Sequence, residues 1–89
     1  MAFNVIAIDF DKTLWDEDSQ TVMNKNKVNK LYFNPTNFIV IYTARQWHRF
    51  HYVKDILDKN EIKYHAIVCE KLRADKYIDD KNETWVLKK

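Results

Sequence analysis

An apolar run that ends in two closely spaced carboxylates constrains this chain most strongly. The run is Val5 to Ile8, and it is followed directly by Asp9-Phe10-Asp11-Lys12-Thr13-Leu14. A run this continuously apolar predicts a buried parallel strand, because a strand with one solvated face alternates apolar and polar residues. Two carboxylates at positions i and i+2 repel each other, so we expect a cation or a shared chemical task to stabilise them.

The apolar segments alternate between strand-like and helix-like patterns. Strands are predicted at 3–10, 38–42, 64–69, 76–78 and 84–87, helices at 22–33 and 47–59, and a polar loop at 15–21. Strands that alternate with helices indicate a mainly parallel sheet with right-handed crossovers. We therefore expect one α/β domain over residues 1–89, with a sheet of four or five strands.

Composition narrows the class of protein. The 89 residues and 46% hydrophobic content suit one small packed domain, and the net charge of +2 is too small to indicate a polyanion partner. Cys69 is the only cysteine, so no internal disulfide can form. No apolar run approaches the roughly 20 residues of a membrane span, and the N-terminus has no signal-peptide pattern. We expect a cytoplasmic protein with no membrane partner.

Polar residues follow three of the predicted strands. Asp9 and Asp11 end the first strand, Thr43 ends the second, and Asp79-Asp80 end the fourth. In open parallel sheets, sites form at the carboxyl ends of the strands, so these groups meet if their strands are neighbours. Two carboxylate pairs facing one pocket favour a hard divalent cation, and Mg²⁺ suits carboxylates, waters and a phosphate oxygen.

These residues resemble the four motifs of the haloacid dehalogenase (HAD) superfamily, in order. The motifs are Asp9-x-Asp11-x-Thr13-Leu14, Thr43, Lys71 and Asp79-Asp80. Within this resemblance, which spans about residues 3 to 81, the segments 41–45 and 71–81 are similar to small capless HAD phosphatases, including those of capsular polysaccharide gene clusters. It implies a three-layer, Rossmann-like HAD core with helices on both faces of the sheet and no cap domain.

The resemblance also implies a Mg²⁺-dependent phosphomonoester hydrolase. Asp9 would be the nucleophile that forms an aspartyl-phosphate, and Asp11 the general acid and then the base. Mg²⁺ would lie on the Asp9 carboxylate, the Asp11 backbone carbonyl and Asp79, with Asp80 binding directly or through water. Thr43 and Lys71 would complete the catalytic set, although Lys76 is an alternative to Lys71.

The phosphate group would be bound around the same strand ends. The Thr43 hydroxyl would donate to a phosphate oxygen, and backbone N–H groups after Asp11 would help. The expected substrate-binding residues are Lys12, Thr13, Thr43, Ala44 and Arg45. Thr43 can equally cap the helix that follows it.

Two features depart from the family pattern. Lys12 stands where glycine is most frequent, which predicts an ordinary backbone conformation there, and with no glycine in the chain the Asn residues are the expected substitutes in turns. The segments 15–21 and 44–70 are too short for a cap domain. An open site suits a bulky substrate. The expected partners are a small phosphorylated substrate or a phosphorylated polymer end, and a second copy of the chain is one possible source of a cap.

Two other functions stay open. Arg45, Arg49 and Lys12, with exposed Trp15 or Trp47, would let a phosphatase of the same fold hold a nucleic-acid end. The other is a non-catalytic HAD-fold protein that only binds a partner. The simpler expectation for Trp47, Phe50 and Val53 is that they lie in the core. The simpler expectation for Asp16, Glu17 and Asp18 is that they favour the start of the following helix.

Overall fold

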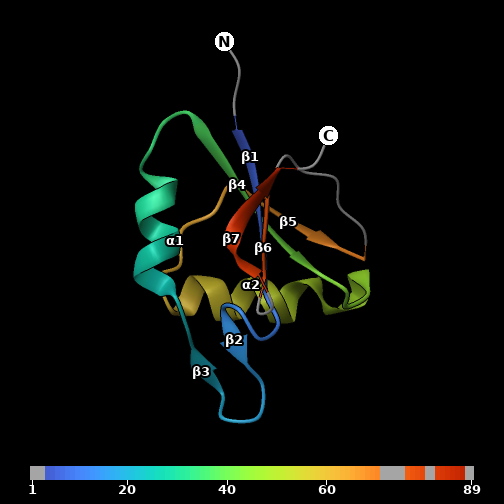
Figure 1. The fold of residues 1–89 in the computed structure, drawn as a ribbon. Coiled ribbons are helices and arrows are strands. Elements are labelled where there is room, and N and C mark those ends of the chain that lie inside the picture. Colours follow the sequence, from blue (N-terminus) through green and yellow to red (C-terminus); the bar gives the residue numbers. More distant parts are fainter. Residues whose placement is uncertain (1–3, 71–75, 80–81, 88–89) are drawn as a thin grey trace.

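The computed structural model shows an α/β fold (Figure 1). It describes residues 4–70, 76–79 and 82–87, and in the last two segments the side chain of Ile78 only. The elements are β1 Asn4–Asp9, β2 Trp15–Asp16, β3 Thr21–Val22, α1 Lys25–Tyr32, β4 Asn37–Thr43, the 3₁₀ helix η1 Trp47–Arg49, α2 Phe50–Lys59, β5 Ala66–Cys69, β6 Lys76–Asp79 and β7 Asn82–Leu87. Neither helix in the described part of the chain has the length and apolarity needed to cross a bilayer.

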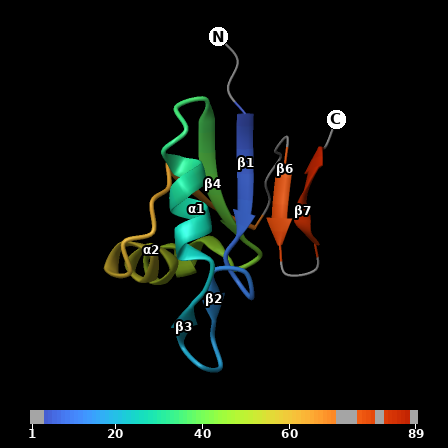
Figure 2. The ribbon, with the colours of Figure 1, turned by 60° about the vertical axis from the view of Figure 1, so that its left-hand side comes forward.

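The main sheet has five strands in the order β5-β4-β1-β6-β7. Figure 2 shows β4, β1, β6 and β7 side by side. The pairs β1–β4, β1–β6 and β4–β5 are parallel, and β7 runs antiparallel to β6. Asp9 pairs with Tyr42 and Ile8 pairs with Ile78, so β1 lies between the two other strands that carry candidate site residues. The candidate residues could meet only if their strands were neighbours, and the strand order fulfils this condition.

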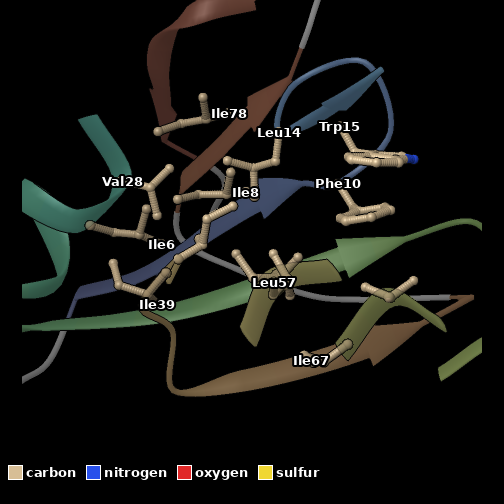
Figure 3. Close-up of a cluster of buried hydrophobic side chains, with 13 residues drawn as sticks. Ile6, Ile8, Phe10, Leu14, Trp15, Val28, Ile39, Leu57, Ile67 and Ile78 are labelled. Atoms are coloured by element: carbon tan, nitrogen blue, oxygen red, sulfur yellow. The ribbon is translucent and has the colours of Figure 1, made fainter. Parts of the chain in front are cut away.

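Both helices pack on one face of this sheet. Buried Val28 of α1 and Leu57 of α2 belong to the same core cluster as Ile6, Ile8 and Ile39 (Figure 3). The crossovers β1–α1–β4 and β4–α2–β5 step in the same direction across the sheet, so right-handed connections place both helices on the same side. The prediction of helices on both faces is thus not met within the described residues.

Two segments differ locally from the prediction. Residues 15–22 are not a plain loop, because β2 and β3 pair antiparallel as a hairpin. The second helix starts with the 3₁₀ turn η1, which leaves Trp47 52% exposed instead of in the core. From Phe50 onward the predicted apolar stripe holds, with Val53 and Leu57 fully buried.

We expect Leu57→Ala to lower the free energy of unfolding by about 3 kcal/mol, because truncating a buried leucine removes apolar burial and leaves a cavity. Leu57 is 0% exposed. Exposed Lys59 lies on the same helix, and Lys59→Ala should change the free energy by less than about 0.5 kcal/mol. Urea unfolding followed by circular dichroism measures both, and equal effects would contradict this assignment of the core.

Candidate active site

The loop after β1 folds back on its own backbone. The Lys12 amide donates to the Trp15 carbonyl over 2.8 Å, and the amides of Leu14 and Trp15 both donate to the Phe10 carbonyl over 3.0 Å. This tight loop holds Lys12 in the left-handed region with φ of 68°. The prediction of an ordinary backbone at Lys12 is therefore wrong, and the Lys12 amide is used within the loop instead of facing a phosphate.

Left-handed conformations recur elsewhere in the described residues. They are adopted by Lys12, Gln20, Asn24, Glu61 and Glu70. Only one of the five is an asparagine, so the expectation that asparagines replace glycine in turns holds at Asn24 alone. At Lys12, Glu61 and Glu70 the backbone amide of the left-handed residue donates to a carbonyl, so hydrogen bonds support these turns in the absence of glycine.

Thr13 belongs to this loop, and its side chain is buried. It is 4% exposed, and its hydroxyl has no hydrogen-bond partner among the described residues. Its carbonyl accepts a hydrogen bond of 2.8 Å from the Asn24 side-chain amide, which ties the loop to the start of α1. Thr43 is buried to a similar degree, at 1% exposed, so the predicted role of Thr13 in substrate binding stays a prediction.

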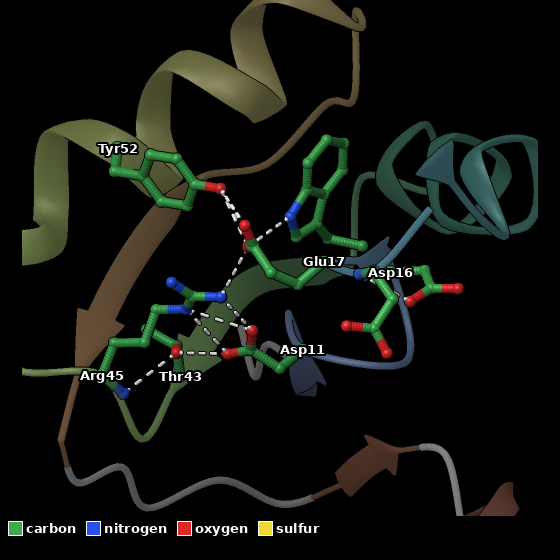
Figure 4. A network of polar contacts seen from close by, with 8 residues as sticks. Asp11, Asp16, Glu17, Thr43, Arg45 and Tyr52 are labelled. Atoms are coloured by element: carbon green, nitrogen blue, oxygen red, sulfur yellow. Dashed lines mark hydrogen bonds and ion pairs between the residues drawn. The ribbon is translucent and has the colours of Figure 1, made fainter. Parts of the chain in front are cut away.

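Asp11 is bound by two of the predicted site residues. The Thr43 hydroxyl donates to Asp11 Oδ2 over 2.9 Å, and Arg45 Nη2 donates to Oδ1 over 2.7 Å (Figure 4). Arg45 Nε also lies 3.1 and 3.2 Å from the two oxygens, so the guanidinium binds the carboxylate through both Nε and Nη2. The backbone amide of Arg45 donates to the Thr43 hydroxyl over 3.1 Å. The structure thus brings together Asp11, Thr43 and Arg45, while Ala44 between them is exposed.

Glu17 forms the second half of this polar cluster. Its carboxylate accepts hydrogen bonds from Arg45 Nη2 over 3.0 Å, Trp15 Nε1 over 2.9 Å and the Tyr52 hydroxyl over 2.8 Å. Sequence reasoning assigned Glu17 only to the start of a helix and did not single out Tyr52. The one available signal was Trp15, an aromatic donor two residues from Glu17 in a polar segment.

The electrostatics of the cluster favour its charged state. The hydrogen bonds of Arg45 to Asp11 raise the pKa of the guanidinium. The hydrogen bond from Trp15, followed by that from Tyr52, lowers the pKa of Glu17. Burial, followed by the bond to Glu17, raises the pKa of Tyr52. The Arg45 guanidinium also lies 5.2 Å from the ring centre of Tyr52 and 5.8 Å from that of Phe10, so rings and carboxylates together fix its position.

The proposed metal ligands are described only in part. Asp9 is half-buried at the end of β1, and the pairing of Ile8 with Ile78 sets the backbone of Asp79 beside it. The Asp79 side chain, Asp80 and Lys71 lie outside the described residues. Among those that are described, no group of three or more histidine, cysteine, aspartate or glutamate residues could hold a metal ion.

Comparison with known proteins adds no relative to this picture. No family model matches the chain, and searches of curated proteins and of solved structures likewise find no match. The function of the site therefore has to follow from the residues of this chain and their geometry.

We expect Lys12→Gly to raise the free energy of unfolding by about 1 kcal/mol, because glycine adopts φ of 68° without the strain of a Cβ atom. Lys59→Gly, at the end of α2, should instead lower it by about 0.5–1 kcal/mol. Chemical denaturation compares the two variants. A loss at Lys12 as large as that at Lys59 would contradict the left-handed assignment.

Glu17 should make stability depend on acid pH. Its pKa is lower in the folded chain, so its ionised form adds stability above the unfolded-state pKa, and this is lost as the pH falls through the folded-state pKa. The wild type should exceed Glu17→Gln in stability at pH 7, and the gap should close between about pH 5 and pH 3. Denaturation midpoints across this range, with Asp18→Asn as the baseline, test this, and a gap independent of pH would contradict it.

Proposed function

We propose that this chain is a Mg²⁺-dependent phosphomonoester hydrolase of the HAD type, with Asp9 as the nucleophile. One observation carries the proposal: the Asp11 carboxylate accepts a hydrogen bond from the Thr43 hydroxyl, 32 residues away, at the carboxyl edge of the sheet. Asp9 ends the strand that leads into Asp11. A nucleophile, an acid and a phosphate donor are the groups that phosphoryl transfer through aspartate needs.

The proposal includes the finer description of the fold, a HAD-type core without a cap domain. The central position of β1 between β4 and β6 supports it, because the site then has a strand end on each side. A helix layer on the second face stays a prediction, because both described α-helices pack on the first face.

The reaction would proceed in two displacements. An oxygen of Asp9 attacks phosphorus in line, so a bond between the carboxylate and phosphorus forms while the ester bond breaks. Asp11 gives its proton to the departing oxygen and then takes a proton from the water that attacks the aspartyl-phosphate. The second displacement releases inorganic phosphate and restores the Asp9 carboxylate.

The phosphate oxygens would be held by donors at the end of β4. The Thr43 hydroxyl and the Arg45 guanidinium already lie within hydrogen-bond distance of Asp11, at the place where negative charge is bound in this structure. The guanidinium fork matches two oxygens of a phosphate as well as those of a carboxylate. Lys71 would add a point charge, and Lys76 is the weaker candidate because its backbone starts β6, about 10 Å before Asp79.

The donor set at the strand ends fits Mg²⁺. Asp9, Asp79, Asp80 and the carbonyl of Asp11 offer the hard oxygen ligands that this ion prefers, and the pairing of β1 with β6 sets Asp79 beside Asp9. When bound, the ion would neutralise charge on the carboxylate and on the transferring phosphoryl group.

A phosphorylated nucleic-acid end is the second candidate substrate. Trp47 is 52% exposed, and the Arg49 guanidinium lies 4.4 Å from the ring centre of Tyr52. A base could stack on Trp47 near Arg45. Trp15 cannot serve in this way, because it is 8% exposed and its ring stacks on Phe10.

Hydrolysis rates on phosphorylated oligonucleotides, compared with the rates on sugar phosphates and nucleotides, separate the two substrate classes. Rates on oligonucleotides that do not depend on salt would count against this candidate.

A purely binding protein is the remaining alternative. It would keep tight binding of its partner after Asp9→Ala and release no phosphate from any ester. The intact set of motif residues argues against this alternative: Asp9, Asp11, Thr43, Lys71, Asp79 and Asp80.

We expect Asp9→Asn to reduce hydrolysis of an aryl phosphate by at least about a thousandfold, because the neutral amide is a poor nucleophile. Asp18→Asn, an exposed carboxylate of the same chain, should keep the wild-type rate. A chelator should abolish activity and added Mg²⁺ should restore it. Phosphate release measures all three, and turnover by Asp9→Asn near the wild-type rate would exclude this nucleophile.

A further inference from the structure

The contacts of Asp11 conflict with its proposed role as an acid. Both of its oxygens accept hydrogen bonds, Oδ1 from Arg45 and Oδ2 from Thr43 and Arg45. A general acid must instead turn a protonated oxygen toward the leaving group. The arrangement in Figure 4 therefore corresponds to a resting state, from which at least Arg45 must withdraw before the proton is transferred.

Glu17 limits how far the Arg45 guanidinium can move away from Asp11. Arg45 Nη2 bridges the two carboxylates, at 2.7 Å from Asp11 Oδ1 and 3.0 Å from Glu17 Oε1. Glu17 is itself tied to the hairpin by Trp15 and to α2 by Tyr52, whose hydroxyl lies 2.8 and 2.9 Å from its two oxygens. A guanidinium that loses Asp11 is thus still attached to a carboxylate held from two other elements.

We propose that Glu17 is a positioning residue that retains Arg45 at the site while the substrate phosphate replaces Asp11 on the guanidinium. This inference rests on the proposed function and adds to it a partner exchange that frees Asp11. A phosphate dianion carries more charge than a carboxylate and also accepts two parallel hydrogen bonds from arginine. It therefore competes well with Asp11 for the side of the guanidinium formed by Nε and Nη2. The lowered pKa of Glu17 keeps its carboxylate ionised during the exchange.

The location of these groups makes the exchange feasible. The side chain of Arg45 is 20% exposed, that of Asp11 35% and that of Glu17 47%, so all three side chains are partly exposed to solvent. An anion can therefore reach the guanidinium without unfolding the loop. Rings of Phe10 and Tyr52 flank the guanidinium and restrict its movement to a short displacement.

Inorganic phosphate provides a probe that needs no turnover. In ¹H–¹⁵N NMR spectra, the Nε–H signal of Arg45, assigned with Arg45→Lys, should shift as phosphate is added, while the Trp15 indole N–H signal should stay in place. In Glu17→Gln, the phosphate Kd obtained from this titration should rise about tenfold. Asp18→Asn, which removes a charge from the same hairpin outside the cluster, should leave the Kd unchanged. An Arg45 signal that saturating phosphate does not move, or equal Kd values in all three proteins, would overturn the proposal.

Steady-state kinetics adds a readout that a structural role would not produce. Glu17→Gln should raise KM about tenfold and change kcat less than about threefold, because the lost anchor weakens phosphate binding before and during the reaction alike. Tyr52→Phe should raise KM by a smaller factor, since it removes one of the donors to Glu17. A fall in kcat without a change in KM would overturn the positioning role. If the wild type hydrolyses no ester, the proposed function fails, and the NMR titration alone then decides the role of Glu17.

Discussion

The bidentate ion pair between Arg45 and Asp11 holds together the parts of the chain that form the site. Asp11 follows β1, Arg45 follows β4, and the guanidinium also contacts Glu17 of the hairpin and the Tyr52 ring of α2. Without a cation here, the carboxylates of Asp11 and Glu17, which both accept from Arg45 Nη2, would lie close together and repel each other. One partly buried positive charge thus connects four segments through polar contacts, in addition to the apolar core that these segments share.

The strand order and the crossover helices determine which face of the sheet is covered. A sheet with β1 in the centre needs crossovers in both directions, but the described helices occupy only the two that lead from β1 to β4 and from β4 to β5. Those helices bury Val28, Val53 and Leu57 against one face. At the carboxyl edge of the sheet, the hairpin β2–β3 and the first turn of α2 both border the polar cluster, because Glu17 accepts hydrogen bonds from Trp15 and Tyr52.

Much of the fold follows from local patterns in the sequence. The apolar runs at Val5 and Phe38 predicted β1 and β4, and the proximity of Asp11 to Thr43 followed from the rule that parallel strands end at one edge. The side of the sheet on which the helices pack did not follow, because it depends on strand order, which the sequence leaves open. Glu17 was missed because a carboxylate in a polar segment shows no periodicity that would reveal its partners. The backbone of Lys12 was mispredicted since loop hydrogen bonds, and not residue preference, set its conformation.

The left-handed lysine in the loop also affects how rigid the candidate site is. A residue with a Cβ atom has only a narrow energy well at positive φ, whereas glycine at the same position samples a broad range of conformations. The loop between Phe10 and Trp15 is thus restricted at the point where glycine would allow it to move. The conformational entropy that a flexible loop would lose on binding an anion has already been lost during folding, so binding energy need not be used to order this backbone.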